Sequence, residues 1–186
     1  RRYWAFILQM QQKLHNRLSY RISYTYSRNE GTAPNASPDV ILGYQQFSDP
    51  NWWVNRDGRL ALDRPHEIIA TATWHAPLDV FITPLFTFTS GRPYTLLATP
   101  DEYTVRTDVV DGSNRLDNQW RLDCRLEKAF IYKDRYRLGI LFDVFNLLNS
   151  NAVTDLVSRN IDANGYLQPA AIVAPRSWQV GVRMVF

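Results

Sequence analysis

Two carboxylates on one predicted strand have a spacing that could support acid–base chemistry. Asp123 and Glu127 fall on the same face of residues 119–131, and glycosidases use such pairs of acids. Arg121 and Arg125 alternate with them on that face. Acids and arginines at every second position favour a ladder of ion pairs over a catalytic dyad. The sequence therefore predicts no catalytic residues, and we expect the protein not to be an enzyme.

The histidines and the cysteine also show no pattern typical of a reaction centre. His15, His66 and His75 lie near predicted strand ends, without the HExxH spacing of a metal site. The lone Cys124 excludes an internal disulfide and a multi-cysteine zinc site. No glycine-rich phosphate loop occurs, and no nucleophile elbow surrounds a serine. We therefore expect neither a metal nor a cofactor.

The elements that position these residues show a period of two, which is typical of β-strands with one apolar face. Most segments contain about ten residues, the length with which a tilted strand crosses a bilayer. Pro84 interrupts the fourth segment. The seven segments are residues 3–13, 17–28, 66–74, 79–90, 119–131, 135–146 and 176–186.

Composition is compatible with this pattern and excludes other classes. Aromatic residues make up 13 % of the chain, and the net charge is +3. This charge is too small and too scattered to indicate nucleic-acid binding. No stretch approaches the roughly 18 apolar residues of a membrane helix. Because the chain begins at Arg1 without a methionine or a signal peptide, we expect it to be a piece of a longer protein.

The connections between the predicted strands alternate in length. Short ones lie at residues 15–16, 75–78 and 133–134, and long polar ones at about 29–65, 91–118 and 147–175. Such long loops are unusual in a compact soluble domain, whereas outer-membrane barrels have short periplasmic turns and long extracellular loops. We therefore expect an all-β fold, an antiparallel transmembrane β-barrel segment of about seven strands.

The last predicted strand alternates apolar and mostly polar residues and ends on an aromatic residue. Aromatic residues form girdles at the two interfaces of outer-membrane barrels. An extended strand can also add to a sheet edge, with its alternate side chains giving specificity. A girdle residue at the interface is therefore one interpretation of the terminal aromatic residue. The alternate side chains are Trp178, Val180, Val182, Met184 and Phe186.

Several motifs carry a resemblance to a known family. The sequence contains SGRPYT at residues 90–95, RLDCRLEKAF at 121–130, FDVFNLLN at 142–149 and APR at 174–176. Together they resemble the last strands of TonB-dependent outer-membrane receptors, most closely those with an upstream carboxypeptidase-regulatory-like domain. That family folds as a 22-strand barrel closed by an N-terminal plug. The resemblance implies that residues 1–186 are the C-terminal part of such a barrel, without its plug and earlier strands.

The resemblance also implies that the last strand is read by the barrel-assembly machinery, rather than acting only as a girdle, and it implies a place and a role. The place is the outer membrane of a Gram-negative-type bacterium, and the role is ligand binding and TonB-dependent uptake, with contact to TonB resting on the resemblance alone. Six loop residues are candidates for contact with an unknown ligand, and Arg56 is a further polar candidate. Packing between loops explains the aromatic residues equally well. The six are Trp52, Trp53, Arg92, Tyr94, Tyr103 and Tyr166.

Register and facing follow from the same pattern. If the fifth and sixth strands join through an odd number of residues or a bulge, Arg125 lies opposite or diagonal to Asp143 on the wet face. Lys128, on the apolar face, is expected to reach the interface. The first strand should pair with a strand from outside this sequence, because lipid does not tolerate an open edge. A continuous lipid-facing band is expected from Leu122, Leu126, Leu138, Ile140, Phe142, Val180 and Val182.

Two other functions remain open at this point. One is a passive porin, which has the same barrel without a separate plug. The other is a soluble, carbohydrate-binding β-sandwich, in which apolar faces would meet across a core. The sandwich leaves the three long loops unexplained.

Overall fold

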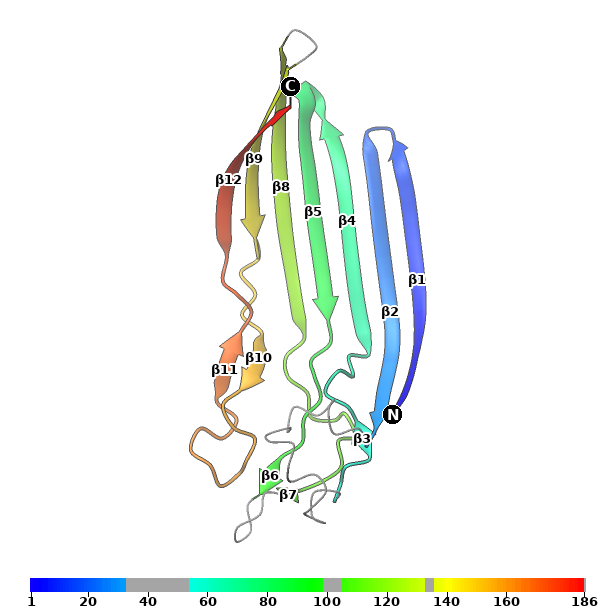
Figure 1. Ribbon diagram of the computed structural model, residues 1–186, viewed down its shortest axis with the longest axis vertical. Coiled ribbons are helices and arrows are strands. Elements are labelled where there is room, and N and C mark those ends of the chain that lie inside the picture. Colours follow the sequence, from blue (N-terminus) through cyan, green and yellow to red (C-terminus); the bar gives the residue numbers. More distant parts are fainter. Residues whose placement is uncertain (33–53, 99–104, 133–135, 186) are drawn as a thin grey trace.

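The computed structural model describes residues 1–32, 54–98, 105–132 and 136–185 as an all-β chain dominated by one antiparallel sheet (Figure 1). The long strands follow one another side by side in chain order, apart from the short β3. They are β1 (Arg2–His15), β2 (Leu18–Gly31), β4 (His66–Ala76), β5 (Val80–Thr89), β8 (Gln119–Tyr132), β9 (Tyr136–Phe145) and β12 (Ser177–Val185).

The seven predicted strands are therefore confirmed as elements, in an antiparallel sheet with the order β1-β2-β4-β5-β8-β9-β12. Their bounds differ from the predicted ones by a few residues; β1, β2 and β8 are each 14 residues long. β1 and β12 form the two outer edges of the described sheet, which stays open. Pro84 pairs with Cys124 without interrupting β5.

The short connections lie together at one end of the sheet, as predicted (Figure 1). Asn16 and Arg17 both have positive φ and link His15 to Leu18, which is the backbone of a type I′ hairpin turn. The register of β1 against β2 shifts between Gln12 and His15, next to this turn. Between β8 and β9, Tyr132 pairs with Tyr136, so the connection has the predicted odd length.

The remaining short connection is a single 3₁₀ turn, η3 (Pro77–Asp79), in which Leu78 and Asp79 have positive φ. Lys128 of β8 donates a hydrogen bond from Nζ to the carbonyl oxygen of Leu78. The lysine thus extends from the apolar face to the turn at the end of the sheet, which agrees with the predicted direction of its side chain. No helix in the described residues is long and apolar enough to cross a bilayer.

The long connections gather at the opposite end and contain the short strands (Figure 1). β3 (Gly58–Arg59) extends the sheet beside β2, β6 (Leu97–Ala98) pairs with β7 (Val105–Arg106), and β10 (Val153–Leu156) pairs with β11 (Pro169–Ile172). Most of the buried apolar residues of the described chain lie in this loop layer rather than on the sheet. They are Leu60, Ala61, Val110 and Ala152, with Ala129 and Leu141 on the sheet.

Candidate functional site

One face of the sheet is apolar across all of its long strands. The register aligns residues into rows that run from one edge toward the other. One row contains Leu18, Trp74, Ile82, Leu126, Phe142 and Val180, and the next toward the turns joins Lys128, Ile140 and Val182. The seven residues predicted to form one continuous apolar band do share this face.

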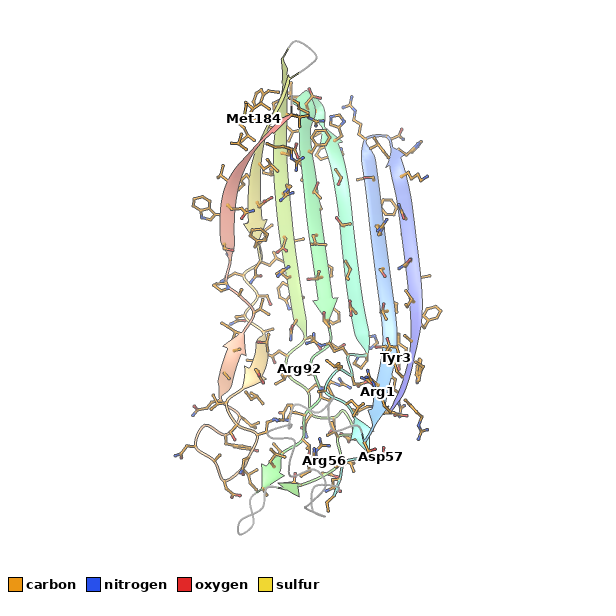
Figure 2. All side chains as sticks on the ribbon, in the orientation of Figure 1. Arg1, Tyr3, Arg56, Asp57, Arg92 and Met184 are labelled. Atoms are coloured by element: carbon orange, nitrogen blue, oxygen red, sulfur yellow. The ribbon has the colours of Figure 1, made fainter. Side chains whose placement is uncertain are left out.

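No layer of the described chain covers that face. Phe142, in the middle of the band, retains 38 % exposure, and Met184 on β12 retains 71 %. Figure 2 shows the side chains of the sheet projecting from the ribbon, with Met184 near the turn end. Large exposed apolar patches mark surfaces that meet a protein or a membrane. The name apolar band is used below for the apolar side chains at even-numbered positions of the long strands; polar residues such as Arg28, His66 and Lys128 share this face toward the strand ends.

The opposite face carries paired charges. Arg125 donates from Nε and Nη2 to the two carboxylate oxygens of Asp143, at 2.6 and 2.9 Å, and Gln179 donates to the same carboxylate at 3.0 Å. The predicted proximity of Arg125 and Asp143 is confirmed, in directly opposed register. The Asp143 side chain is 6 % exposed, but that of Arg125 is 45 % exposed, so water screens the pair and we expect it to contribute about 1 kcal/mol.

The two acids with the spacing of a catalytic pair are engaged in ion pairs on this face. Asp123 lies 2.9 Å from Arg121 and accepts a hydrogen bond from the backbone N–H of Asn146 at 2.8 Å. Glu127 lies 3.5 Å from Arg183. Each acid therefore has a basic partner, as the ladder interpretation requires. In the described residues, no group of three His, Cys, Asp or Glu side chains could hold a metal ion.

Aromatic rings gather on the apolar band at its loop end. Tyr26 lies edge-on to Trp4, with ring centroids 5.4 Å apart, and 5.3 Å from His66. The Tyr24 hydroxyl and Nδ1 of His66 form a 2.9 Å hydrogen bond. Rings that are apolar on one side and polar at the tip suit a boundary between hydrocarbon and water.

The SGRPYT segment organises the loop layer. The Ser90 hydroxyl accepts a hydrogen bond from the His66 amide, and the Gly91 amide donates to Asn118. A Cβ at Gly91 would overlap the carbonyl oxygen of Leu116, so only glycine allows these two backbones to approach. The sequence motif is visible without a structure, but this close approach is not.

A buried carboxylate holds the same layer together. The Asp63 side chain is fully buried and accepts hydrogen bonds from the Asn29 amide at 2.7 Å and from Arg115 Nη2 at 2.6 Å. Arg59 lies 3.5 Å away. Arg115 also donates to the carbonyl oxygens of Asp63 and Gly91. Sequence reasoning missed this centre, because nothing in the local pattern marks Asp63 as buried.

The FDVFNLLN motif ends in a second hydrogen-bonded centre. Asn146 is buried with positive φ, and its amide group donates to the carbonyl oxygens of Ser150 and Ala174, while its oxygen accepts from the Ser150 amide. Asn149, also at positive φ, accepts from the Arg176 amide. Both asparagines lie where the chain leaves β9, and they also connect the loop back to the start of β12.

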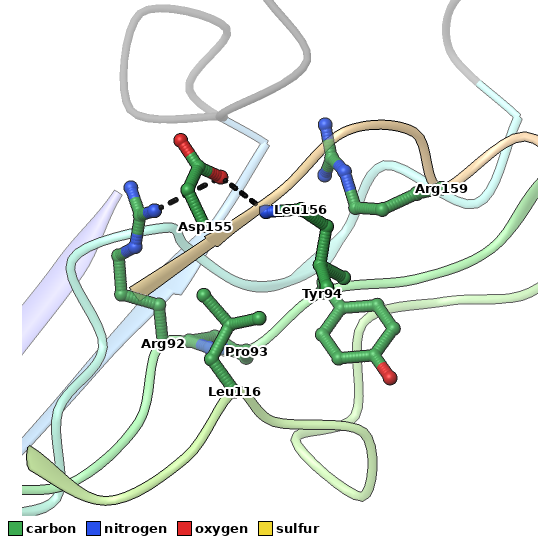
Figure 3. A pocket seen from close by; sticks show the side chains of 7 residues that line it. All are labelled: Arg92, Pro93, Tyr94, Leu116, Asp155, Leu156 and Arg159. Atoms are coloured by element: carbon green, nitrogen blue, oxygen red, sulfur yellow. Dashed lines mark hydrogen bonds and ion pairs between the residues drawn. The ribbon is translucent and has the colours of Figure 1, made fainter. Parts of the chain in front are cut away.

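Two of the six candidate ligand contacts, Arg92 and Tyr94, line one hollow in the loop layer (Figure 3). Arg92 donates to the carbonyl oxygen of Thr154 at 2.7 Å and lies 3.3 Å from Asp155. The enclosed space is about 20 Å³, room for roughly one water molecule. The other residues that line it are Pro93, Leu116, Leu156 and Arg159.

Of the four remaining ligand candidates, the structure describes only Tyr166. Tyr166 is half-exposed in the connection between β10 and β11 and does not line this hollow. Trp52, Trp53 and Tyr103 lie outside the described residues. Arg56 is only 8 % exposed, so it belongs to the interior of the loop layer.

The charges of Arg64 and Arg92 interact. Burial lowers the pKa of the Arg64 guanidinium from its ordinary value, and the nearby charge of Arg92 lowers it further, against an opposing effect of Glu67. An arginine stays charged under all ordinary conditions. The two cations therefore repel each other, and Asp155 balances the charge of Arg92 at the hollow.

Comparisons with protein-family models, with curated proteins and with solved structures found no match for this chain.

Proposed function

We propose that this chain is the C-terminal part of an outer-membrane β-barrel, most closely of the TonB-dependent receptor type, whose role is ligand binding and uptake at the cell surface. The observation that carries the proposal is the uncovered apolar band on one face of seven consecutive antiparallel strands, with paired charges on the other face. A transmembrane barrel needs this alternation, because one face meets lipid and the other meets water.

The height of the apolar band supports a bilayer. On β8 the band runs from Trp120 to Phe130, ten steps of about 3.3 Å each, or roughly 33 Å along the strand. A tilt of about 40° reduces this to roughly 25 Å along the membrane normal, the height of the apolar belt of such barrels. The aromatic cluster around His66 lies near one limit of the band and Lys128 near the other.

The distribution of connections supports an orientation with the short turns at the periplasmic side and the loop layer outside the cell. Ligand contact then involves the loops, where Arg92 and Tyr94 lie together. Uptake driven by TonB rests on the motif resemblance alone. A passive porin has the same barrel, and a plug domain in the upstream sequence distinguishes the receptor from it.

The soluble sandwich receives less support. It needs a second sheet packed on the apolar face, and among the described residues the two small sheets, β6–β7 and β10–β11, belong to the loop connections instead. The open edges of β1 and β12 require partners in lipid, because unpaired backbone groups are costly there. We expect these partners to be further strands of the same barrel, from the upstream sequence or another chain.

Extraction behaviour of the full-length protein tests the proposal. A transmembrane barrel should stay in the membrane pellet after washing with alkaline carbonate and become soluble only in detergent. A peripheral protein released by carbonate serves as the control in the same preparation. Release of the full-length protein by carbonate alone would refute the membrane assignment.

We also propose that β12 is the strand recognised during assembly. Its side chains Trp178, Val180, Val182 and Met184 belong to the apolar band. One backbone edge of β12 is unpaired in the described sheet. Phe186, outside the described residues, continues the alternation in the sequence. Replacing Phe186 with serine should lower insertion in cells while refolding into lipid vesicles stays nearly unchanged. Equal, modest losses in both assays would instead indicate a girdle residue.

A further inference from the structure

A second hollow lies on the charged face of the sheet, at its turn end. It leaves an open space of about 270 Å³. Beside it the register puts two small residues, because Ala129 pairs with Gly139, and Gly139 pairs with Arg183. A Cβ at Gly139 would come within 3.1 Å of Glu127 Oε1, so the Glu127 side chain extends over Gly139 next to the hollow. The lining residues are Thr73, Phe81, Thr83, Glu127, Arg137, Arg183 and Val185.

The hollow combines an aromatic wall with excess positive charge. Phe81 stacks on His75 with ring centroids 4.4 Å apart and planes 7° apart. Arg137 lies above the Phe81 ring, 5.8 Å from its centroid. Glu127 is already paired with Arg183. Two arginines and one acid line the space, which therefore has an uncompensated positive charge.

Arg137, on β9, lacks the carboxylate partner that the charged-face arginines of β8 and β12 have. Arg121, Arg125 and Arg183 each have a carboxylate within 3.5 Å. Arg137 has none within the described part of the chain, and its guanidinium lies over the Phe81 ring instead. A guanidinium can donate two parallel hydrogen bonds to one carboxylate, and the open space beside Arg137 leaves room for such a group.

We infer that this hollow receives an acidic side chain from polypeptide outside residues 1–186, which pairs with Arg137 and packs against Phe81. The inference rests on the proposed function to the extent that the charged face is the interior of a barrel. The occupant's chemistry follows from charge complementarity alone: an Asp or Glu next to an apolar or small residue that can contact Phe81 and Val185.

Carbodiimide crosslinking tests this contact in the full-length, detergent-purified protein. Arg137→Lys keeps the charge and provides an amine that forms an amide with a touching carboxylate, with loss of water taken up by the carbodiimide as a urea. Peptide mass spectrometry should identify a new amide between position 137 and an Asp or Glu outside residues 1–186. Arg125→Lys is the matched control and should crosslink to Asp143, its opposed partner.

Two outcomes would overturn the inference. One is a crosslink from position 137 only to Glu127 or to another carboxylate of residues 1–186. The other is no crosslink at position 137 in a sample where position 125 reacts. Carbonate extraction of the same Arg137→Lys protein tests separately whether the protein spans the membrane. Failure of the barrel proposal is therefore distinguishable from failure of the proposed contact at Arg137.

Discussion

Arginine in place of Ile140 should lower the free energy of unfolding from lipid by roughly 1–3 kcal/mol. A lipid-facing arginine costs about 2–4 kcal/mol at the middle of a bilayer and about 0–1 kcal/mol near the interfaces, and Ile140, opposite Lys128, lies between the middle of the apolar band and one of its limits. Ile140 lies in the apolar band between Lys128 and Val182 and is 44 % exposed in the described chain. Equilibrium denaturation of the full-length protein in lipid vesicles measures the change.

The matched control must place the same arginine on the charged face. Gly139 is adjacent, but a side chain there meets Glu127 and Arg183. The cost of an arginine at Gly139 would therefore include steric overlap as well as the effect of the face on which it lies. Gln179→Arg is cleaner, because Gln179 already hydrogen-bonds Asp143 and an arginine can replace that contact. We expect this variant to change the unfolding free energy by less than about 1 kcal/mol. Equal costs for both variants would contradict a bilayer on one face only.

Removal of the Asp63 carboxylate should open the loop layer. Asp63→Ala leaves the Arg115 guanidinium and the Asn29 amide without their acceptor in a buried place. Breaking a buried pair costs about 3–5 kcal/mol, and partial exposure of Arg115 reduces the expected cost to roughly 2–4 kcal/mol. Hydrogen exchange at the Leu60 amide, which donates to Asn29, should accelerate at least about 30-fold.

The control for Asp63 is the exposed acid of the same layer. Asp155 pairs with Arg92 at 3.3 Å, but its side chain is 64 % exposed, and such pairs contribute about 0–1 kcal/mol. Asp155→Ala should therefore change exchange at Leu60 by only a few-fold. If Asp63→Ala changed exchange no more than Asp155→Ala, Asp63 would not be the centre that holds the loop layer together.

The sheet was predictable from the sequence because strand alternation is a local signal. Alternate apolar residues such as Leu18, Tyr20 and Ile22 need only their neighbours to indicate a strand and its apolar face. Opposed residues in an antiparallel pair must point to the same face of the sheet, and this limits the possible registers. Arg125 can lie opposite Asp143 once the connection between their strands has an odd number of residues. The approximate positions of the strands, the alternation of short and long connections and the hairpin order all come from this one pattern, whereas the strand bounds differ by a few residues.

The loop layer was not predictable in the same way. Asp63 and Arg115 are far apart in the sequence and meet only because two loops fold over each other. The close backbone approach at Gly91 depends on Leu116, again from another loop. Short strands such as β6 and β10 have too few residues for a periodic signal. Composition identifies these segments as loops, but their contacts are set by tertiary packing.

Spin-label accessibility along β12 tests most directly whether the apolar band faces lipid. Labels at single cysteines, in a Cys124→Ser background, would report residues 178–184 of the full-length protein in lipid vesicles. The proposed barrel predicts high collision with oxygen and low collision with a nickel chelate at Trp178, Val180, Val182 and Met184, and the reverse at Gln179 and Arg183. High nickel access, or low access to both reagents, at the four apolar positions would contradict a lipid-facing band.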